Sequence, residues 1–203
     1  MSKRAEALAE LISRPDIGAE EIAAHLDALP LGKQVAAART LSGRRIQRSL
    51  WNKVEGTPRI RVRDMVPLDY DPMRPVIFHG KNSLPAFTEF QKICCRPPAA
   101  QAADVLWGYN ETTIKTMVGP GYYVCHDTES SPLGGAAFDY RELPAAHPAG
   151  WPEIRPNSAG LSRFVYNGMV DYMRRVSQSV FIGSATRRER EMGSYFVVVR
   201  DLG

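Results

Sequence analysis

The distribution of proline restricts this chain more than any other feature of its sequence. Of the 15 prolines in the 203 residues, 13 lie between positions 58 and 156. Proline has no backbone N–H and breaks a helix interior, so this stretch excludes long helices. The runs between the prolines are short and rich in aromatic and β-branched residues, which favours β-strands. The sequence therefore predicts two parts, residues 1–57 and residues 58–203.

Residues 1–57 predict a compact unit of four short helices. Apolar residues recur at helical spacing in each of the four segments. The second helix is predicted to begin at Gly18, because Glu21 is placed three residues later to accept a free backbone N–H. Breaks at Pro15 and Pro30 separate the first three helices. Ser42 is expected to cap the start of the fourth helix, and Gly56 to end it.

Residues 58–203 predict many short strands and no alternation of strands with helices. This pattern favours an antiparallel sheet that is closed or nearly closed into a barrel, with the helices at one end or across its mouth. Residues 84–92 fit a helix or a lid, since Phe87, Phe90 and Ile93 have helical spacing, and 170–176 fit a strand or a helix. The predicted strands are 76–79, 105–110, 112–118, 122–126, 136–141, 164–166, 180–185 and 195–200.

Composition and charge narrow the class of protein. With 44% hydrophobic and 24% charged residues, the chain is not of the disordered or collagen-like type. No run approaches the roughly 20 apolar residues of a membrane span, and the charged N-terminus is not a secretory signal. Three cysteines, two of them adjacent, do not make a disulfide framework. These features together predict a protein of the reducing cytoplasm.

The positive charge is concentrated in the N-terminal third. Residues 1–63 contain 12 Lys and Arg against 7 Asp and Glu, a net charge of +5, and the remainder has 14 against 15. A basic helical unit can dock on nucleic acid or an acidic protein, and residues 19–41 have the outline of a helix-turn-helix. Asp27 occupies the position where such turns favour glycine. We therefore favour a solvated helix face over nucleic-acid binding.

Polar residues at the ends of predicted strands are candidates for a binding site. His79 and Lys81 follow the apolar run 76–78, so they are placed to rim a pocket as a base and an anion-holding group. A turn that faces water is the simpler interpretation. Cys125 and His126 are adjacent, but neighbours on a strand point to opposite faces, which prevents them from pairing as nucleophile and base.

Asp171 and Arg174 present their charges differently on a helix and on a strand. On a helix they form a surface ion pair, whereas on a strand one of them points into the barrel, where a charged group must be paired and can orient a ligand. Cys94 and Cys95 lack the C-x-x-C spacing of a redox pair. The four histidines show no metal-ligand spacing, so no metal is predicted, and no cofactor is assigned.

The C-terminal third resembles a known family in three segments. These are D-Y-M-R-R-V at 171–176, V-F-I-G at 180–183 and Y-F-V-V-V-R at 195–200. The pattern is similar to the end of small, largely uncharacterised bacterial proteins of lipocalin-like character that carry a GXWXG module. The GXWXG motif itself does not occur here. The resemblance implies a lipocalin-like barrel in which Trp107 stacks on Arg200.

Taken together, these patterns predict an α+β protein that binds a small apolar or aromatic molecule in a lipocalin-like barrel. One alternative is an isomerase, cyclase or hydrolase of a lipophilic substrate that uses His79 or His126 as acid or base. The other is a basic helical interaction module. Aromatic residues including Phe138, Tyr166 and Phe196 are expected to line the cavity. The predicted ligand-binding residues are His79, Lys81, Trp107, Tyr109, Tyr122, His126, Asp171, Arg174 and Arg200.

Overall fold

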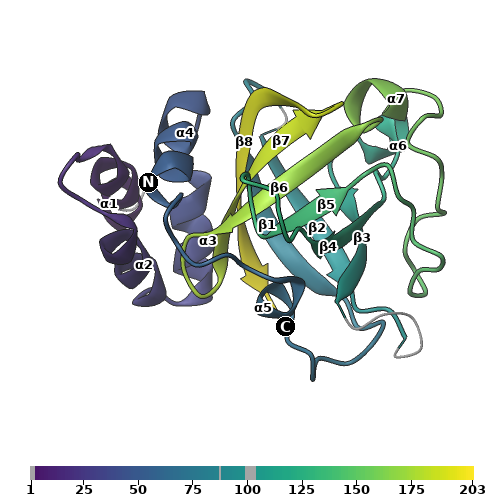
Figure 1. The fold of residues 1–203 in the computed structure, drawn as a ribbon, viewed down its shortest axis with the longest axis horizontal. Helices are drawn as coiled ribbons and strands as arrows, with labels where there is room; N and C mark the ends of the chain where they lie inside the picture. The colour runs from purple at the N-terminus through teal and green to yellow at the C-terminus, as the bar shows by residue number, and fades with distance from the viewer. Residues whose placement is uncertain (1–2, 87, 99–103) are drawn as a thin grey trace.

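The computed structural model describes residues 3–86, 88–98 and 104–203 (Figure 1). Its centre is a closed antiparallel barrel in which each strand pairs with the next along the chain and the last strand pairs with the first. This confirms the predicted barrel and the α+β class. The strands are β1 (Val76–Asn82), β2 (Glu89–Cys95), β3 (Val105–Glu111), β4 (Tyr123–Asp127), β5 (Ala136–Asp139), β6 (Met169–Arg175), β7 (Val180–Arg187) and β8 (Arg190–Asp201).

Side chains point alternately into and out of the barrel along each strand, and many of those that point inward are aromatic. Phe78 on β1, Phe138 on β5 and Phe181 on β7 all belong to one buried apolar cluster. The ring centroids of Phe78 and Phe181 are 6.1 Å apart across this interior. Successive strand residues face opposite sides, so the neighbours of these residues point outward. The barrel's own rings therefore fill a large part of its interior.

The predicted four short helices are confirmed, but their predicted position is wrong. Figure 1 shows α1 (Lys3–Ser13), α2 (Ala19–Asp27), α3 (Leu31–Arg39) and α4 (Arg44–Lys53) beside the barrel. The helices cover the side wall and not the mouth, because the outer face of β7 and β8 is itself apolar. The helices share a second buried cluster with outward residues of those strands, which include Ile182, Val197 and Val199.

Short helices close both ends of the barrel. α5 (Val62–Met65) lies at one end, and its buried residues belong to the interior cluster. α6 (Lys115–Val118) and α7 (Ser162–Val165) lie together at the other end, where the Ser162 hydroxyl donates to the Val118 carbonyl (Figure 1). Within the described residues, no helix has the length and apolar character needed to cross a bilayer.

Three local predictions are wrong. Residues 112–118 include α6 and residues 164–166 overlap α7 instead of forming strands, because both segments pack together over the end of the barrel, where the Ser162 hydroxyl donates to the Val118 carbonyl. The segment 84–92, predicted as a helix or lid, includes the start of β2; Phe87 lies outside the described residues. The ambiguous segment 170–176 is strand β6 up to Arg175.

The proline-rich segment 144–156 covers the outer wall of the barrel, and its last residues, 152–156, run beside α6 and α7. Trp151 packs edge-on against Tyr109 with the ring centroids 5.0 Å apart. The Tyr122 hydroxyl donates to the Pro152 carbonyl from beneath the same segment. A small third cluster of Cys95, Trp107 and Val124, with Trp151 packed against it, lies under this cover.

A buried polar cluster in the barrel

The barrel interior contains a lysine. On β2, Phe90 and Cys94 pack with the interior cluster, and Lys92 lies between them on the same face of the strand. Only 1% of the Lys92 side chain and 4% of the Asp171 side chain are exposed to solvent. Lysine and aspartate are rarely this buried unless they are paired. β6 supplies Asp171 to the same interior, opposite Phe138 of β5.

Four side chains form one hydrogen-bonded network, which we call the inner cluster: Lys92, Asn110, Tyr140 and Asp171. Lys92 Nζ donates to Asp171 Oδ2 at 3.1 Å, to Asn110 Oδ1 at 3.2 Å and to the Tyr140 hydroxyl. The Tyr140 hydroxyl in turn donates to Asp171 Oδ2 at 3.1 Å. An ammonium group has three N–H bonds, so all the donors of Lys92 are used.

One polar atom of the inner cluster has no partner. Asp171 Oδ1 is buried and accepts no hydrogen bond within the described residues. A buried acceptor without a donor costs roughly 1–3 kcal/mol, and such atoms are rare in folded proteins. The site therefore offers one free acceptor, next to a carboxylate oxygen whose charge Lys92 already balances.

Aromatic rings enclose the Lys92 ammonium. Its Nζ lies 4.6 Å from the ring centroid of Phe138, 4.9 Å from that of Tyr123 and 5.0 Å from those of Tyr140 and Phe196. A cation over the face of a ring is attracted by the ring's quadrupole, at roughly 0.5–2 kcal/mol for each ring. These rings therefore help to stabilise a positive charge in the interior.

Burial changes the pKa of two residues of the inner cluster, Lys92 and Tyr140. Loss of hydration lowers the pKa of the Lys92 ammonium, and the Asp171 carboxylate opposes that change. Burial also raises the pKa of the Tyr140 hydroxyl well above its ordinary value, and the neighbouring Asp171 raises it further. Tyr140 is therefore a neutral hydrogen-bond donor at neutral pH.

A hollow lies just outside the inner cluster. α6, α7 and residues 152–156 surround a space of about 370 Å³, and Val118 and Ser162 are in its wall. Val118 also belongs to the interior cluster, so it separates the hollow from the barrel interior. Behind it the rings of Tyr140 and Tyr166 are stacked, with centroids 5.4 Å apart and planes at 16°. Tyr140 of the inner cluster is thus covered by Tyr166, the residue that follows α7.

Of the residues predicted to bind a ligand, the structure brings only Asp171 into the inner cluster. His79 and Lys81 lie on the outer face of β1. His79 Nε2 is 3.2 Å from Asp201 Oδ2, and Lys81 Nζ donates to Thr88 Oγ1 at 2.7 Å. Trp107, Tyr109 and Tyr122 lie on the outer wall beneath residues 144–156. They do not line the interior, whereas Phe138, Tyr166 and Phe196 do.

The two predicted arginines join helices to the barrel. Arg174 stacks on Trp51 of α4 with its guanidinium carbon 3.9 Å from the ring centroid, and donates to the Trp51 carbonyl at 3.0 Å. Arg200 donates to the carbonyls of Asp64 and Met65 of α5 at 2.8 and 3.0 Å. The pairing of Trp107 with Arg200 is therefore wrong, because Trp107 faces the outer wall and Arg200 fastens the cap at one end.

His126 also lies outside the barrel. Its Nε2 is 3.7 Å from Asp139 Oδ2, and this carboxylate raises the pKa of His126. Together with Glu142 these residues place three candidate metal-ligand atoms within 4.8 Å of one another. Arg141 already donates to both oxygens of Asp139, from Nε at 2.9 Å and Nη2 at 2.6 Å. A guanidinium thus occupies the carboxylate that a metal would need.

The adjacent residues Cys94 and Cys95 lie on opposite sides of the barrel wall. Cys94 belongs to the interior cluster, and Cys95 belongs to the outer cluster with Trp107. Both are free thiols, and burial raises the pKa of Cys95 to about 12. Cys125 faces inward while His126 faces outward, as strand alternation predicts.

Sequence reasoning missed three of the four residues in the inner cluster. Phe90, Lys92 and Cys94 alternate with period two, which marks a strand with a lysine on its apolar face. Helical spacing of Phe90 with Ile93 hid that signal. Asn110 ends a predicted strand and Tyr140 lies in another. The sequence around them does not show whether their side chains point into the barrel or away from it.

Comparisons with protein families, curated proteins and solved structures found no match to this chain. The barrel and the inner cluster are therefore the features from which a function is inferred.

Proposed function

We propose that this protein binds a small, largely apolar or aromatic molecule inside its barrel, and that the inner cluster recognises one polar group of that molecule. An eight-stranded barrel is just wide enough for side chains to fill it or for one small ligand to occupy it. Aromatic rings fill much of this interior, so the ligand binds where displacement of the covering side chains exposes the inner cluster. The observation that carries the proposal is the buried Asp171, which is paired with Lys92 on one oxygen and left without a donor on the other.

Stability alone does not account for this pair. Replacing a buried ion pair by apolar residues of similar volume is often neutral or stabilising, by roughly 1–4 kcal/mol. An apolar interior would suit the surrounding rings of Tyr123, Phe138 and Phe196 equally well. Perturbed, buried charges of this kind concentrate at binding and catalytic sites. The interior charge is best explained by a ligand.

The unpaired oxygen of Asp171 indicates which kind of polar group the ligand carries. Asp171 Oδ1 is an acceptor, and the three donors of Lys92 are already used. The pair Lys92–Asp171 is neutral overall, so a charged ligand would leave an unbalanced buried charge. The ligand therefore carries a hydroxyl or N–H donor on an uncharged apolar or aromatic body.

Access runs through the cover at the α6–α7 end. α7 is four residues long and lies between Gly160 and Gly168, which have φ values of 53° and 72°. Glycine is the residue that adopts positive φ without strain, and such positions can absorb a change of backbone direction. Displacement of α7 would move Tyr166 away from Tyr140 and expose the inner cluster to the hollow of about 370 Å³.

A matched pair of probes tests the proposal. Cinnamyl alcohol has an aromatic body and one hydroxyl donor, and cinnamyl methyl ether lacks that donor. We expect calorimetric titration to show that the alcohol binds about tenfold to a hundredfold more tightly, because the ether leaves the Asp171 acceptor unpaired.

Variants locate the binding. We expect the double variant Lys92→Met with Asp171→Leu to lose the preference for the alcohol, since both charges are removed together and the fold is kept. Lys81→Met is the matched control, because Lys81 lies on the outer face of β1. Equal affinity for the two probes, or an unchanged preference in the double variant, would overturn the proposal.

Neither histidine that was suggested for acid–base catalysis reaches the interior. His79 contacts Asp201 and His126 contacts Asp139, both on the outside of the barrel. Binding is therefore the function that the geometry supports better than catalysis by these residues.

A further inference from the structure

Exposed apolar side chains gather at the end of the barrel that α6 and α7 cover. Met117 on α6 and Phe164 on α7 are 66% and 62% exposed, which is unusual for side chains of this size. Leu161, Val165 and Met192 are also exposed at this end. We call these five residues the α6–α7 patch. Contiguous exposed apolar side chains of this kind mark interaction sites.

Contacts between α6, α7 and the β7–β8 hairpin hold the residues of the patch at one end of the barrel. Met117 and Leu161 line the same hollow between α6 and α7. Arg187 of the β7–β8 hairpin donates to the carbonyls of Phe164 and Val165 at 3.1 and 2.7 Å. The hairpin, which carries Met192, is thereby held against α7.

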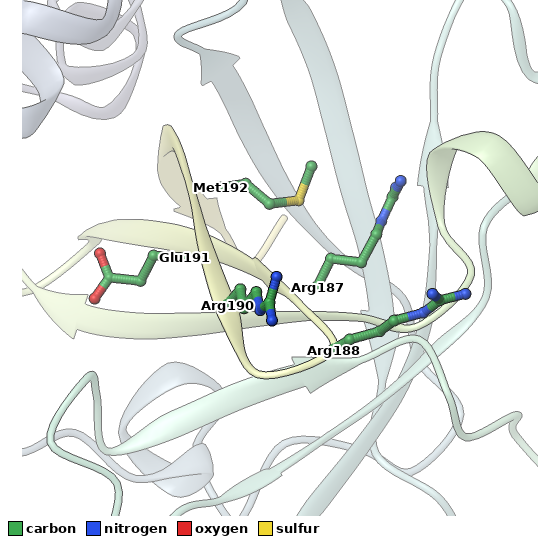
Figure 2. A pocket seen from close by; sticks show the side chains of 5 residues that line it. All are labelled: Arg187, Arg188, Arg190, Glu191 and Met192. Carbon is green, nitrogen blue, oxygen red and sulfur yellow. The ribbon is translucent and has the colours of Figure 1, made fainter.

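Arginines surround the patch. Figure 2 shows Arg187, Arg188 and Arg190 around a hollow of about 470 Å³ that Met192 also lines, with Glu191 extending away from Arg187 and Arg188. Arg163 lies on α7, with its guanidinium carbon 4.7 Å from the ring centroid of Phe164. In the part of the chain that the structure describes, these four arginines form no ion pair with a carboxylate.

We propose that the α6–α7 patch docks on the surface of an anionic lipid bilayer. Apolar side chains flanked by arginines fit the boundary between acyl chains and negatively charged headgroups, where the two kinds of side chain act together. Arg163, Arg188 and Arg190 supply the positive charge that complements anionic headgroups. Phe164 and Met117 supply the apolar contact. The cover over the barrel interior then faces the membrane, from which an apolar molecule can pass.

This inference rests on surface residues and does not require the proposed function, since binding to vesicles is measured without any ligand. The probe is a vesicle of phosphatidylcholine and phosphatidylglycerol in equal parts, with vesicles of phosphatidylcholine alone for comparison. We expect the protein to sediment with the mixed vesicles and much less with the uncharged ones.

The apolar contribution is tested at Phe164. Phe164→Ser is expected to lower the partition coefficient on mixed vesicles about tenfold, because the lost side chain no longer enters the acyl boundary. Leu68→Ser is the matched control, since Leu68 is 56% exposed and lies between α5 and β1 at the opposite end. If the two substitutions lowered the partition coefficient equally, the assignment of membrane binding to the α6–α7 end would be overturned.

The charged contribution is tested at the hairpin. Arg188→Gln with Arg190→Gln is expected to lower binding about twentyfold at low salt and to flatten its salt dependence. The matched control is Arg45→Gln with Arg48→Gln on the basic α4. The proposal would be contradicted if only the α4 variant lost binding, or if the protein sedimented with neither kind of vesicle. It would also be contradicted if the protein bound no vesicle but formed a dimer that the Phe164→Ser substitution made monomeric.

Discussion

Lys92 is held by three different kinds of interaction in one place. It pairs with Asp171, donates to the neutral oxygens of Asn110 and Tyr140, and lies among aromatic rings. Each of these favours the ammonium form, while burial opposes it and lowers the pKa of Lys92. The balance makes the cluster sensitive to removal of either charge alone.

That sensitivity can be measured with a double-mutant cycle. Lys92→Met alone is expected to lower the free energy of unfolding by roughly 3–5 kcal/mol, because it leaves the Asp171 carboxylate buried and unpaired. Adding Asp171→Leu should recover most of that loss, since no charge then remains inside. Urea unfolding of the two variants provides the measurement. Losses that simply add would show that the two residues do not depend on each other.

His126 gives the outer wall a pH dependence. The Asp139 carboxylate raises the folded-state pKa of His126, so protonation favours the folded form. The stabilisation is fully present below the unfolded pKa of about 6.5 and is lost as the pH rises through the folded pKa. Relative to His126→Asn, the protein should therefore be more stable at about pH 5 than at about pH 8. If the unfolding free energies of the wild type and of His126→Asn changed equally with pH over this interval, the proposed effect of the His126–Asp139 pair would be contradicted.

Strand glycines and aromatic rings match each other across the barrel interior. Gly80 is paired with Phe90, Gly108 with Tyr123, and Gly183 with Phe196 in adjacent strands. In each pair the ring covers the position where the glycine would carry a Cβ. These pairs let large rings turn across the strand and enclose Lys92, and they fix strand register in the process.

Gly108 shows the cost of filling such a position. A Cβ there would lie 2.5 Å from both the Ile93 carbonyl oxygen and the Tyr123 hydroxyl. Gly108→Ala is expected to lower the free energy of unfolding by roughly 1–3 kcal/mol through overpacking. Gly32→Ala on α3, where nothing lies within 4 Å, should instead raise it by roughly 0.5–1 kcal/mol. Thermal unfolding of both variants gives the comparison; the same sign in both would contradict this packing.

The sequence predicted elements best where a single physical signal was present. The prolines between 58 and 156 and the period-two strands led to the barrel, and helical spacing led to the four N-terminal helices. The segment 112–118 also alternates, yet it forms a turn and α6, because it caps the barrel end beside Ser162. Tertiary contact outweighed the local pattern there.

The candidate site was harder to predict than the fold, because inward and outward faces follow from register. Asp171 was recognised as a charge that a strand could place inside the barrel, and it is inside. Trp107 and Tyr109 are aromatic and alternate correctly, but they lie on the outer face beneath residues 144–156. A shift of one residue in the register exchanges the two faces of a strand. No local feature of the sequence determined which register these strands adopt.

In the whole molecule, different segments of the chain cover different parts of the barrel. The helical unit packs on β7 and β8, residues 144–156 cover the outer wall of β3 and β4, and α5 closes one end. The remaining end has two four-residue helices, exposed apolar side chains and arginines that form no ion pair among the described residues. Both proposals follow from this asymmetry, since the least protected end is also the one nearest the inner cluster.

Native mass spectrometry of the purified protein tests most directly whether the interior binds a molecule. For the wild type we predict a mass above that of the denatured chain, or such a complex on addition of cinnamyl alcohol, and a bare mass for Lys92→Met with Asp171→Leu under both conditions. The surplus mass should disappear on denaturation. A bare wild-type mass with and without the alcohol, or an equal surplus in the double variant, would contradict binding at Lys92 and Asp171.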